Sequence, residues 1–321
     1  MLVTGGAGYI GSAFVERCAA EGERVVVLDD LRTGHRAAVP EGVPFVEADV
    51  ADVTAVCAAV RDHAVDACVH FAGYLDVAES VADPLKYHQN NVAATLALLG
   101  ALSSMGVRRF VFSSSASVYG SAREVPISED APCAPENPYG RTKRVIEEVL
   151  TDLEHVGALR AFSLRYFNAA GATRLSVERH DPETHLIPLA LQAALGRRDA
   201  LVIHGDDYPT RDGTALRDYV HVADLADAHL RALRALREGQ PGGALNLGTA
   251  TGTTVREVLR AVEAVTGRTV PVRVGPRRAG DVAALVADPR RAAARLGWRP
   301  EVTSIRDVVS SAWRAMPPAA G

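Results

Sequence analysis

Tyr139 and Lys143 lie four positions apart and form the pair in this chain best suited to acid–base chemistry. Asn137 followed by Pro138 predicts the start of a helix, and residues four apart share one face of a helix. A compact ammonium near a phenol favours the phenolate, so we expect Lys143 to lower the pKa of Tyr139 from its usual value of about 10. Tyr139 is therefore our candidate general acid/base, although this spacing also suits a surface tyrosine beside a solvated lysine.

A glycine turn, Gly5 to Gly11, follows an apolar run and precedes a helical pattern. Such a turn lets the backbone approach a pyrophosphate and directs a helix N-terminus towards it. The next apolar run ends before Asp29, whose carboxylate would accept hydrogen bonds from an adenosine ribose and repel a 2′-phosphate. The sequence therefore predicts a site for NAD rather than NADP, the alternative being a glycine turn without a ligand.

Several hydroxyl groups follow the apolar run at Phe112, in the segment Ser113 to Gly120. Ligands bind at the carboxyl ends of strands in open parallel sheets, so Ser115 could share a substrate oxygen with Tyr139. A serine-rich strand end that satisfies its own backbone is the alternative. The chain has no Gly-x-Ser-x-Gly, and its ten histidines show no triad or metal-ligand spacing, so we expect neither acyl transfer nor a metal site. Hydride transfer is the chemistry that remains.

The elements that position these residues follow from the hydrophobic pattern. Short β-branched runs alternate with helical patterns in the first half, which is typical of a parallel sheet covered by helices. We expect strands at 1–4, 24–28, 44–47, 67–71, 109–113 and 161–167, and helices at 9–21, 52–61, 84–105 and 139–156. The predicted fold class is α/β: a doubly wound parallel-sheet Rossmann domain that binds NAD, with a smaller mixed α/β substrate domain.

We place the domain boundary at residue 168, so that 1–168 bind the dinucleotide and 169–321 bind the substrate, with segments crossing back to the first domain. The alternation of apolar runs with helical patterns becomes less regular after the boundary, in a polar stretch at 171–183 and a turn-rich stretch at 205–214. Later patterns predict helices at 186–195, 223–237 and 255–266, and a strand at 245–247.

Composition excludes several classes of partner. The formal net charge is −4, which gives no basic surplus for a nucleic acid or an anionic membrane. No apolar run approaches the roughly 18 residues of a membrane span. The four cysteines are scattered, and 48% hydrophobic residues over 321 positions can form a core without disulfides. We expect a cytoplasmic protein that binds a small molecule.

The chain resembles the extended short-chain dehydrogenase/reductase superfamily and, within it, the UDP-glucose 4-epimerase family. The glycine turn, Asp29, His70 to Gly73, Ser115 and the Tyr139–Lys143 pair carry the superfamily resemblance. More specific segments are Glu79 to Val81, Asn90 to Val92, Ser113 to Gly120, Arg165 to Asn168, Gly205 to Thr210, Arg217 to Ala226 and Arg277 to Asp281. Together they span almost the whole chain.

The resemblance implies an isomerase that inverts C4 of a UDP-hexose, UDP-glucose or UDP-galactose, through a transient 4-keto sugar, with NAD as cofactor. It implies a homodimer formed through the helices near 84–105 and 139–156. It assigns catalysis to Ser115, Tyr139 and Lys143. It assigns the NAD site to Gly5, Gly8, Tyr9, Ile10, Gly11, Asp29, Asp30, Asp49, Val50, Phe71, Ala72, Gly73, Asn90, Ser113, Tyr139, Lys143 and Phe167. It assigns the substrate site to Ser115, Tyr139, Asn168, His185, Leu186, Val202, His204, Arg217, Arg278, Asp281 and Leu285.

Three departures from the family pattern bear on ligands. Leu75 and Asp76 stand where many relatives carry a lysine near the cofactor, and His204 stands where relatives often place an aromatic against uracil. Leu285 replaces a large tyrosine on the C2 side of the sugar, which predicts that the site accepts N-acetylated sugars.

Other functions stay open. The nearest rival is a nucleotide-sugar 4,6-dehydratase, although Ala116-Ser117 replaces the Asp-Glu pair usual in such enzymes. A UDP-GlcNAc or UDP-hexuronate 4-epimerase is a second alternative. An NAD-binding sensor without activity is a third, which the retention of Ser115, Tyr139 and Lys143 disfavours.

Overall fold

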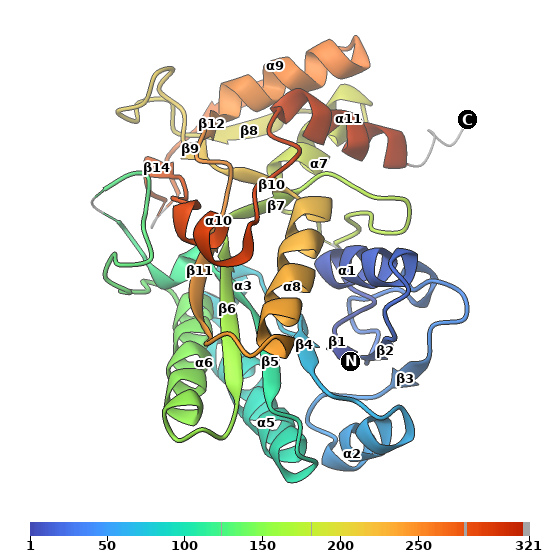
Figure 1. The fold of residues 1–321 in the computed structure, drawn as a ribbon. Coiled ribbons are helices and arrows are strands. Elements are labelled where there is room, and N and C mark those ends of the chain that lie inside the picture. The colour runs from blue at the N-terminus through green and yellow to red at the C-terminus, as the bar shows by residue number, and fades with distance from the viewer. Residues whose placement is uncertain (123, 181, 279–280, 317–321) are drawn as a thin grey trace.

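The computed structural model describes residues 1–122, 124–180, 182–278 and 281–316 (Figure 1). Its centre is a seven-stranded parallel sheet in the order β11-β6-β5-β4-β1-β2-β3. The strands are β1 (Leu2–Thr4), β2 (Val26–Asp29), β3 (Phe45–Glu47), β4 (Cys68–His70), β5 (Arg109–Ser115), β6 (Arg160–Tyr166) and β11 (Gly243–Leu247). The strand order reverses between β1 and β4, which is where doubly wound sheets bind their ligands.

Helices cover both faces of this sheet, because successive strand residues point to opposite sides. Val3 of β1 contributes to the apolar cluster shared with α1 (Tyr9–Ala20) and α8 (Val222–Arg237). Its neighbour Leu2 contributes to the cluster shared with α2 (Val53–Asp62), α5 (Ala94–Ser104) and α6 (Pro138–His155). The two-sided burial confirms the predicted doubly wound arrangement.

The predicted helix at 84–105 is not a regular α-helix. It begins as α4 (Pro84–Tyr87), widens to a π-helical segment, η2 (His88–Ala93), and continues as α5. The Thr95 hydroxyl donates to the carbonyl oxygen of Asn91 at 2.8 Å. Single π turns within α-helices often occur at functional sites, and this one carries Asn90 and Asn91.

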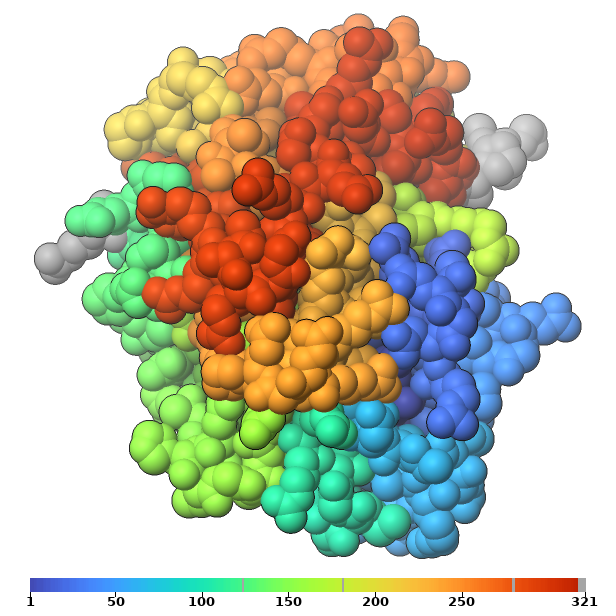
Figure 2. Space-filling model, in the orientation of Figure 1, coloured from blue at the N-terminus to red at the C-terminus, as the bar shows by residue number. Residues whose placement is uncertain are grey.

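The second half of the chain contributes to two regions. The strand β11 pairs with β6, and α8 packs on α1, so both belong to the central layers. A separate apolar cluster joins α7 (Leu186–Ala194), α9 (Val255–Thr266) and α11 (Ile305–Ala315). In Figure 2 the orange and red segments of this half spread over the top and front of the molecule and meet the blue N-terminal segment.

Small sheets that the pattern did not predict complete the second region. The strand β7 (Asn168–Ala170) pairs with β10 (Tyr219–His221), and β8 (Leu201–His204) pairs with β13 (Val272–Gly275). A third sheet joins β12 (Thr253–Thr254), β9 (Leu216–Arg217) and β14 (Ala284–Leu285). The remaining short elements are α3 (Val77–Ala82), α10 (Arg290–Leu296) and the 3₁₀ turns η1 (Arg36–Ala38) and η3 (Ala116–Val118).

No helix in the described part of the chain is both long and apolar enough to span a bilayer.

Candidate active site

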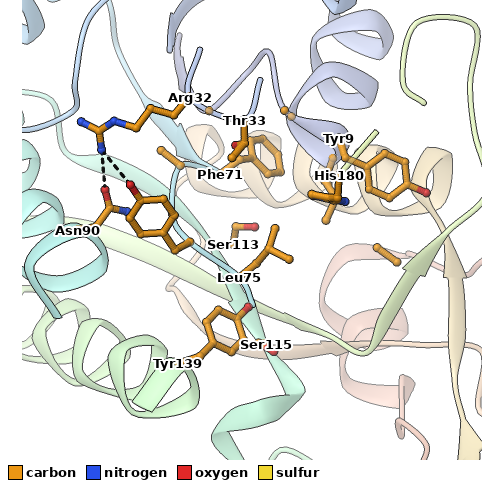
Figure 3. Close-up of a pocket in the computed structure, with 18 of the residues that line it drawn as sticks. Tyr9, Arg32, Thr33, Phe71, Leu75, Asn90, Ser113, Ser115, Tyr139 and His180 are labelled. Carbon is orange, nitrogen blue, oxygen red and sulfur yellow. Dashed lines mark hydrogen bonds between the residues drawn. The ribbon is translucent and has the colours of Figure 1, made fainter. Parts of the chain in front are cut away.

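A cavity of about 330 Å³ lies at the carboxyl edge of the sheet, beside the reversal between β1 and β4 (Figure 3). Every residue that we assigned to NAD lines it, from Gly5 in the glycine turn to Phe167 after β6. Ser115, Tyr139, Asn168 and His185 of the predicted substrate site line it too. One cavity therefore joins the residues predicted to bind the dinucleotide to the proposed acid/base.

The glycine turn is packed too closely for larger residues. Gly5 has a φ of +70°, and a Cβ placed on Gly11 would lie 2.1 Å from the carbonyl oxygen of Gly5. Gly8, the N-cap of α1, supplies no capping side chain. The first-turn N–H groups of α1 are therefore available to a pyrophosphate.

Asp29 lies at the end of β2 with 7% of its surface exposed. Its Oδ2 accepts from the Ala7 N–H and its Oδ1 from the Leu31 N–H, each at 2.9 Å. Burial raises the pKa of this carboxyl, while the two backbone hydrogen bonds lower it. These contacts fix the carboxylate beside the glycine turn, so the acidic group and the helix N-terminus together fit an adenosine diphosphate such as that of NAD.

The predicted catalytic trio of Ser115, Tyr139 and Lys143 is positioned by β5 and α6. Asn137 caps α6, its Oδ1 accepting from the Gly140 N–H at 2.8 Å, and Pro138 occupies the first turn.

All three side chains are buried, with exposed fractions of 9% for Tyr139, 6% for Lys143 and 8% for Ser115. Lys143 Nζ donates to the Ser113 carbonyl oxygen at 2.9 Å and lies 5.8 Å from the centroid of the Tyr139 ring. In Figure 3, Tyr139 and Ser115 face each other at the lower edge of the cavity.

The electrostatics of the trio differ from the sequence prediction. Burial raises the pKa of Tyr139, and the group that lowers it is the Ser115 hydroxyl through a hydrogen bond. The expected lowering of this pKa by Lys143 is therefore wrong for this arrangement. Burial in turn lowers the pKa of Lys143 to about 8, against the charge of Glu147, which raises it. Desolvation outweighs pairing because both groups are enclosed.

The Lys143 pKa predicts a pH-dependent stability. Between pH 8 and the usual lysine value of 10.5, the unfolded chain binds a proton that the folded chain does not. The free energy of unfolding should therefore rise with pH across this window, by about 3 kcal/mol relative to Lys143→Met. Urea unfolding at several pH values checks this, with Lys86→Met, at the only other lysine, as control. Parallel pH curves for the wild type and Lys143→Met would contradict the burial argument.

A buried ion pair between Glu147 of α6 and Arg165 of β6 lies next to the predicted catalytic trio. Arg165 of β6 donates from Nε to Glu147 Oε1 at 2.8 Å and from Nη2 to Glu147 Oε2 at 2.6 Å. The hydroxyl of Ser114 donates to the same Oε1 at 2.6 Å, and Arg165 Nη1 donates to the Tyr119 hydroxyl oxygen at 2.9 Å. The pair links α6 to β5 and β6, and so fixes the helix that carries Tyr139 and Lys143.

Sequence reasoning missed several residues of the cavity. Arg32 lies at one end of the cavity, where its Nη1 donates to Asn90 Oδ1 at 3.4 Å (Figure 3). Its Nη2 also donates to Asp49 Oδ2 at 2.6 Å, and its Nη1 to the Tyr74 hydroxyl oxygen at 3.3 Å. Tyr166 also lines the cavity and is hydrogen-bonded to Ser113. Arg32 and Tyr74 lie outside the regular elements and so follow no period, whereas Tyr166 belongs to the Arg165 to Asn168 segment already singled out.

Sequence reasoning also predicted no metal site, but the structure brings four potential ligands together. Glu178, His180, Glu183 and His185 come from the polar stretch before α7. Their spacing in sequence gave no signal, because an irregular loop determines how they meet.

The other predicted substrate residues lie on the second region, outside the lining of this cavity. Arg217 Nη2 is 3.5 Å from Asp281 Oδ1, and Leu285 of β14 pairs with Arg217 of β9. Leu186 begins α7, Val202 and His204 lie on β8, and Arg278 is exposed. Ala279 and Gly280 of the Arg277 to Asp281 segment lie outside the described residues.

Known proteins are similar to almost the whole chain. The NAD dependent epimerase/dehydratase family matches residues 1–248. The chain is 46% identical to a UDP-glucose 4-epimerase of Lacticaseibacillus casei over 98% of this chain and 95% of that one.

Solved structures match equally well. A UDP-glucose 4-epimerase of Brucella ovis in complex with NAD gives a TM-score of 0.95 at 46% identity, covering 98% of this chain and 97% of that one. A UDP-glucose-4-epimerase of Stenotrophomonas maltophila with bound NAD and formylated UDP-arabinopyranose gives 0.94 at 42% identity, covering 98% and 96%.

Proposed function

The chain belongs to the NAD dependent epimerase/dehydratase family, and from this premise we propose that it inverts C4 of a UDP-hexose, interconverting UDP-glucose and UDP-galactose. The observation that carries the proposal is the position of Tyr139 and Ser115, buried side chains that line the same cavity as the dinucleotide residues. An acid/base and a hydride acceptor must reach the same carbinol, and a shared cavity allows this.

Each residue of the trio has a distinct task. Tyr139 accepts the proton of the sugar 4-hydroxyl and returns it at the end of the cycle. The Ser115 hydroxyl donates to the Tyr139 oxygen, which favours the phenolate against the effect of burial, and it orients the sugar oxygen. Lys143 donates from Nζ to the Ser113 carbonyl oxygen and so holds the end of β5 against α6 beside the site. NAD⁺, held by the glycine turn and by Asp29, would supply the hydride acceptor for C4 and the hydride source for the opposite face of the 4-keto sugar.

The nucleotide end of the substrate must stay bound while the sugar turns over. We assign this anchor to residues 169–321, with residues 1–168 holding NAD, and to Asn168 at the junction. The guanidinium groups of Arg217 and Arg278 can donate paired hydrogen bonds to phosphates, and the Asp281 carboxylate can accept hydrogen bonds from ribose hydroxyls. We add His185, Leu186, Val202 and His204 to the same anchor. Binding energy from this nonreacting part keeps the intermediate from escaping.

Leu285 is our candidate for the residue that sets the tolerated bulk at C2 of the sugar. Its side chain packs against the small apolar cluster of Val118, Tyr119 and Ile127, beside the strand that carries Arg217. Leu285→Tyr should reduce kcat/KM for UDP-GlcNAc by about tenfold or more while sparing UDP-glucose, since overfilling a pocket costs about 1–3 kcal/mol. Steady-state assays with both sugars check this. If neither the wild type nor Leu285→Ser converts UDP-GlcNAc, Leu285 is not the residue that limits the bulk at C2.

We further propose a homodimer that acts in galactose metabolism in the cytoplasm. An apolar cavity of about 260 Å³ lies between α5 and α6, with Leu96 43% exposed at its edge, and this supports pairing through these helices. All four cysteines are free, which suits a reducing compartment.

The direct test is to incubate the purified protein, with bound NAD confirmed, with UDP-galactose and to follow UDP-glucose by chromatography. Conversion to equilibrium without added oxidant supports the proposal. A 4-keto-6-deoxy sugar as the product would instead indicate a dehydratase. If only UDP-GlcNAc or UDP-hexuronates are converted in a parallel panel, the substrate is one of those sugars rather than UDP-galactose. If no sugar is converted, an NAD-binding sensor without activity is favoured.

A further inference from the structure

Two histidines and two glutamates meet in the loop between β7 and α7. Each of Glu178, His180, Glu183 and His185 offers one ligand atom, and these atoms all lie within 4.8 Å of one another. None of the four has a part in the proposed hydride chemistry, although three of them line the cavity and one, His185, is also assigned to the nucleotide anchor. The cluster therefore calls for its own explanation.

Hydrogen bonding does not satisfy the cluster. His185 Nδ1 lies 2.9 Å from Glu183 Oε1, with which it forms a hydrogen bond, and 2.8 Å from Glu178 Oε1. One ring nitrogen carries at most one hydrogen, so it cannot serve both carboxylates. Glu178 Oε1 and His180 Nδ1, which lie 3.6 Å apart, are buried and have no hydrogen-bond partner among the described residues. The Glu178 side chain is only 8% exposed, and a buried carboxylate oxygen without a partner is costly.

We propose that Glu178, His180, Glu183 and His185 bind one divalent transition-metal ion, with Zn²⁺ as the best match. Two imidazole nitrogens and two carboxylate oxygens form a donor set that suits tetrahedral zinc. Mg²⁺ and Ca²⁺ prefer oxygen ligands alone and fit this set less well. An ion at the centre would satisfy both unpartnered atoms at once, which a simple ion-pair network does not.

The location indicates a structural role. Tyr9, in the first turn of α1, donates from its hydroxyl to the Gly171 carbonyl oxygen at 2.5 Å and accepts at its own carbonyl oxygen from the Ser176 hydroxyl at 2.7 Å. The Tyr9 and His180 rings lie 6.4 Å apart, edge to face, at one side of the cavity (Figure 3). An ion bound by the cluster would hold loop residues 171–180 and 182–185 against the glycine turn.

Metal titration of the full-length protein tests the site without any sugar substrate, so its outcome is separate from that of the proposed function. Chelator-stripped protein is titrated with Zn²⁺ against a chromophoric competitor. We expect one ion per chain and at least tenfold weaker binding for Glu178→Gln and for His180→Gln. His35→Gln, at an exposed histidine outside the cluster, should bind like the wild type.

A second measurement keeps the proposal testable if a variant fails to fold. X-ray absorption at the zinc edge of the wild-type protein should show nitrogen and oxygen ligands with imidazole scattering. Sulfur in the coordination shell would assign the ion to a cysteine and overturn the proposal. Absence of stoichiometric binding, or equal affinity in all folded variants, would overturn it as well.

Discussion

Tyr139→Phe should reduce kcat for UDP-galactose by about 10²–10⁴-fold, the usual contribution of a positioned general acid/base. The ring stays, so packing around α6 is retained, but no group remains that can take the proton of the 4-hydroxyl. KM should change little, because the nucleotide supplies most of the binding energy. Coupled assays of UDP-glucose formation measure both constants.

Tyr208→Phe is the matched control for this prediction. The Tyr208 hydroxyl is buried and has no hydrogen-bond partner in the described residues, so its removal should leave kcat within about twofold. Bound NAD should be quantified in both variants after denaturation. A Tyr139→Phe enzyme that holds NAD and turns over at the wild-type rate would show that another group moves the proton.

Glu147→Leu should destabilise the protein by about 3–5 kcal/mol, because it leaves the Arg165 guanidinium buried without its counter-charge. Both side chains of this pair are at most 5% exposed. The neighbouring Glu148 is 57% exposed and pairs with Arg144 at the surface, so Glu148→Leu should change the free energy of unfolding by less than about 1 kcal/mol. Denaturant unfolding of the two variants makes this comparison within one turn of α6.

The double variant Glu147→Leu/Arg165→Met distinguishes an unpaired charge from lost packing. Removing both charges should recover much of the stability, since an apolar pair of similar size often replaces a buried ion pair without loss. If the double variant is as unstable as the sum of the single ones, the charge argument fails.

The central sheet could be predicted from sequence because its strands are apolar on both faces and alternate with amphipathic helices. The glycine turn and Asp29 were recognisable because their spacing follows from the geometry of one strand–turn–helix unit. The start of α6 was equally readable, since Asn137 and Pro138 cap it locally. Where the determinants are local, the prediction agrees with the structure.

The remainder depends on contacts between distant segments. The strands β9, β12 and β14 have two residues each, too few to show a period, and their pairing is set by tertiary packing. The polar loop that contains Glu178 and His185 has no helical or strand periodicity from which their proximity could be predicted. The pKa of Tyr139 could not be foreseen because the spacing to Lys143 says nothing of how deeply both are buried.

Isotope tracing at C4 tests the central claim most directly. UDP-galactose is converted in D₂O, and the hydrogen at C4 of the UDP-glucose product is examined by NMR and mass spectrometry. If Tyr139 moves only the hydroxyl proton while a hydride leaves C4 and returns within the cavity, the product carries the original hydrogen at C4. Deuterium at C4 would contradict this account, because it would mean that the C4 hydrogen departs as a proton and exchanges with solvent.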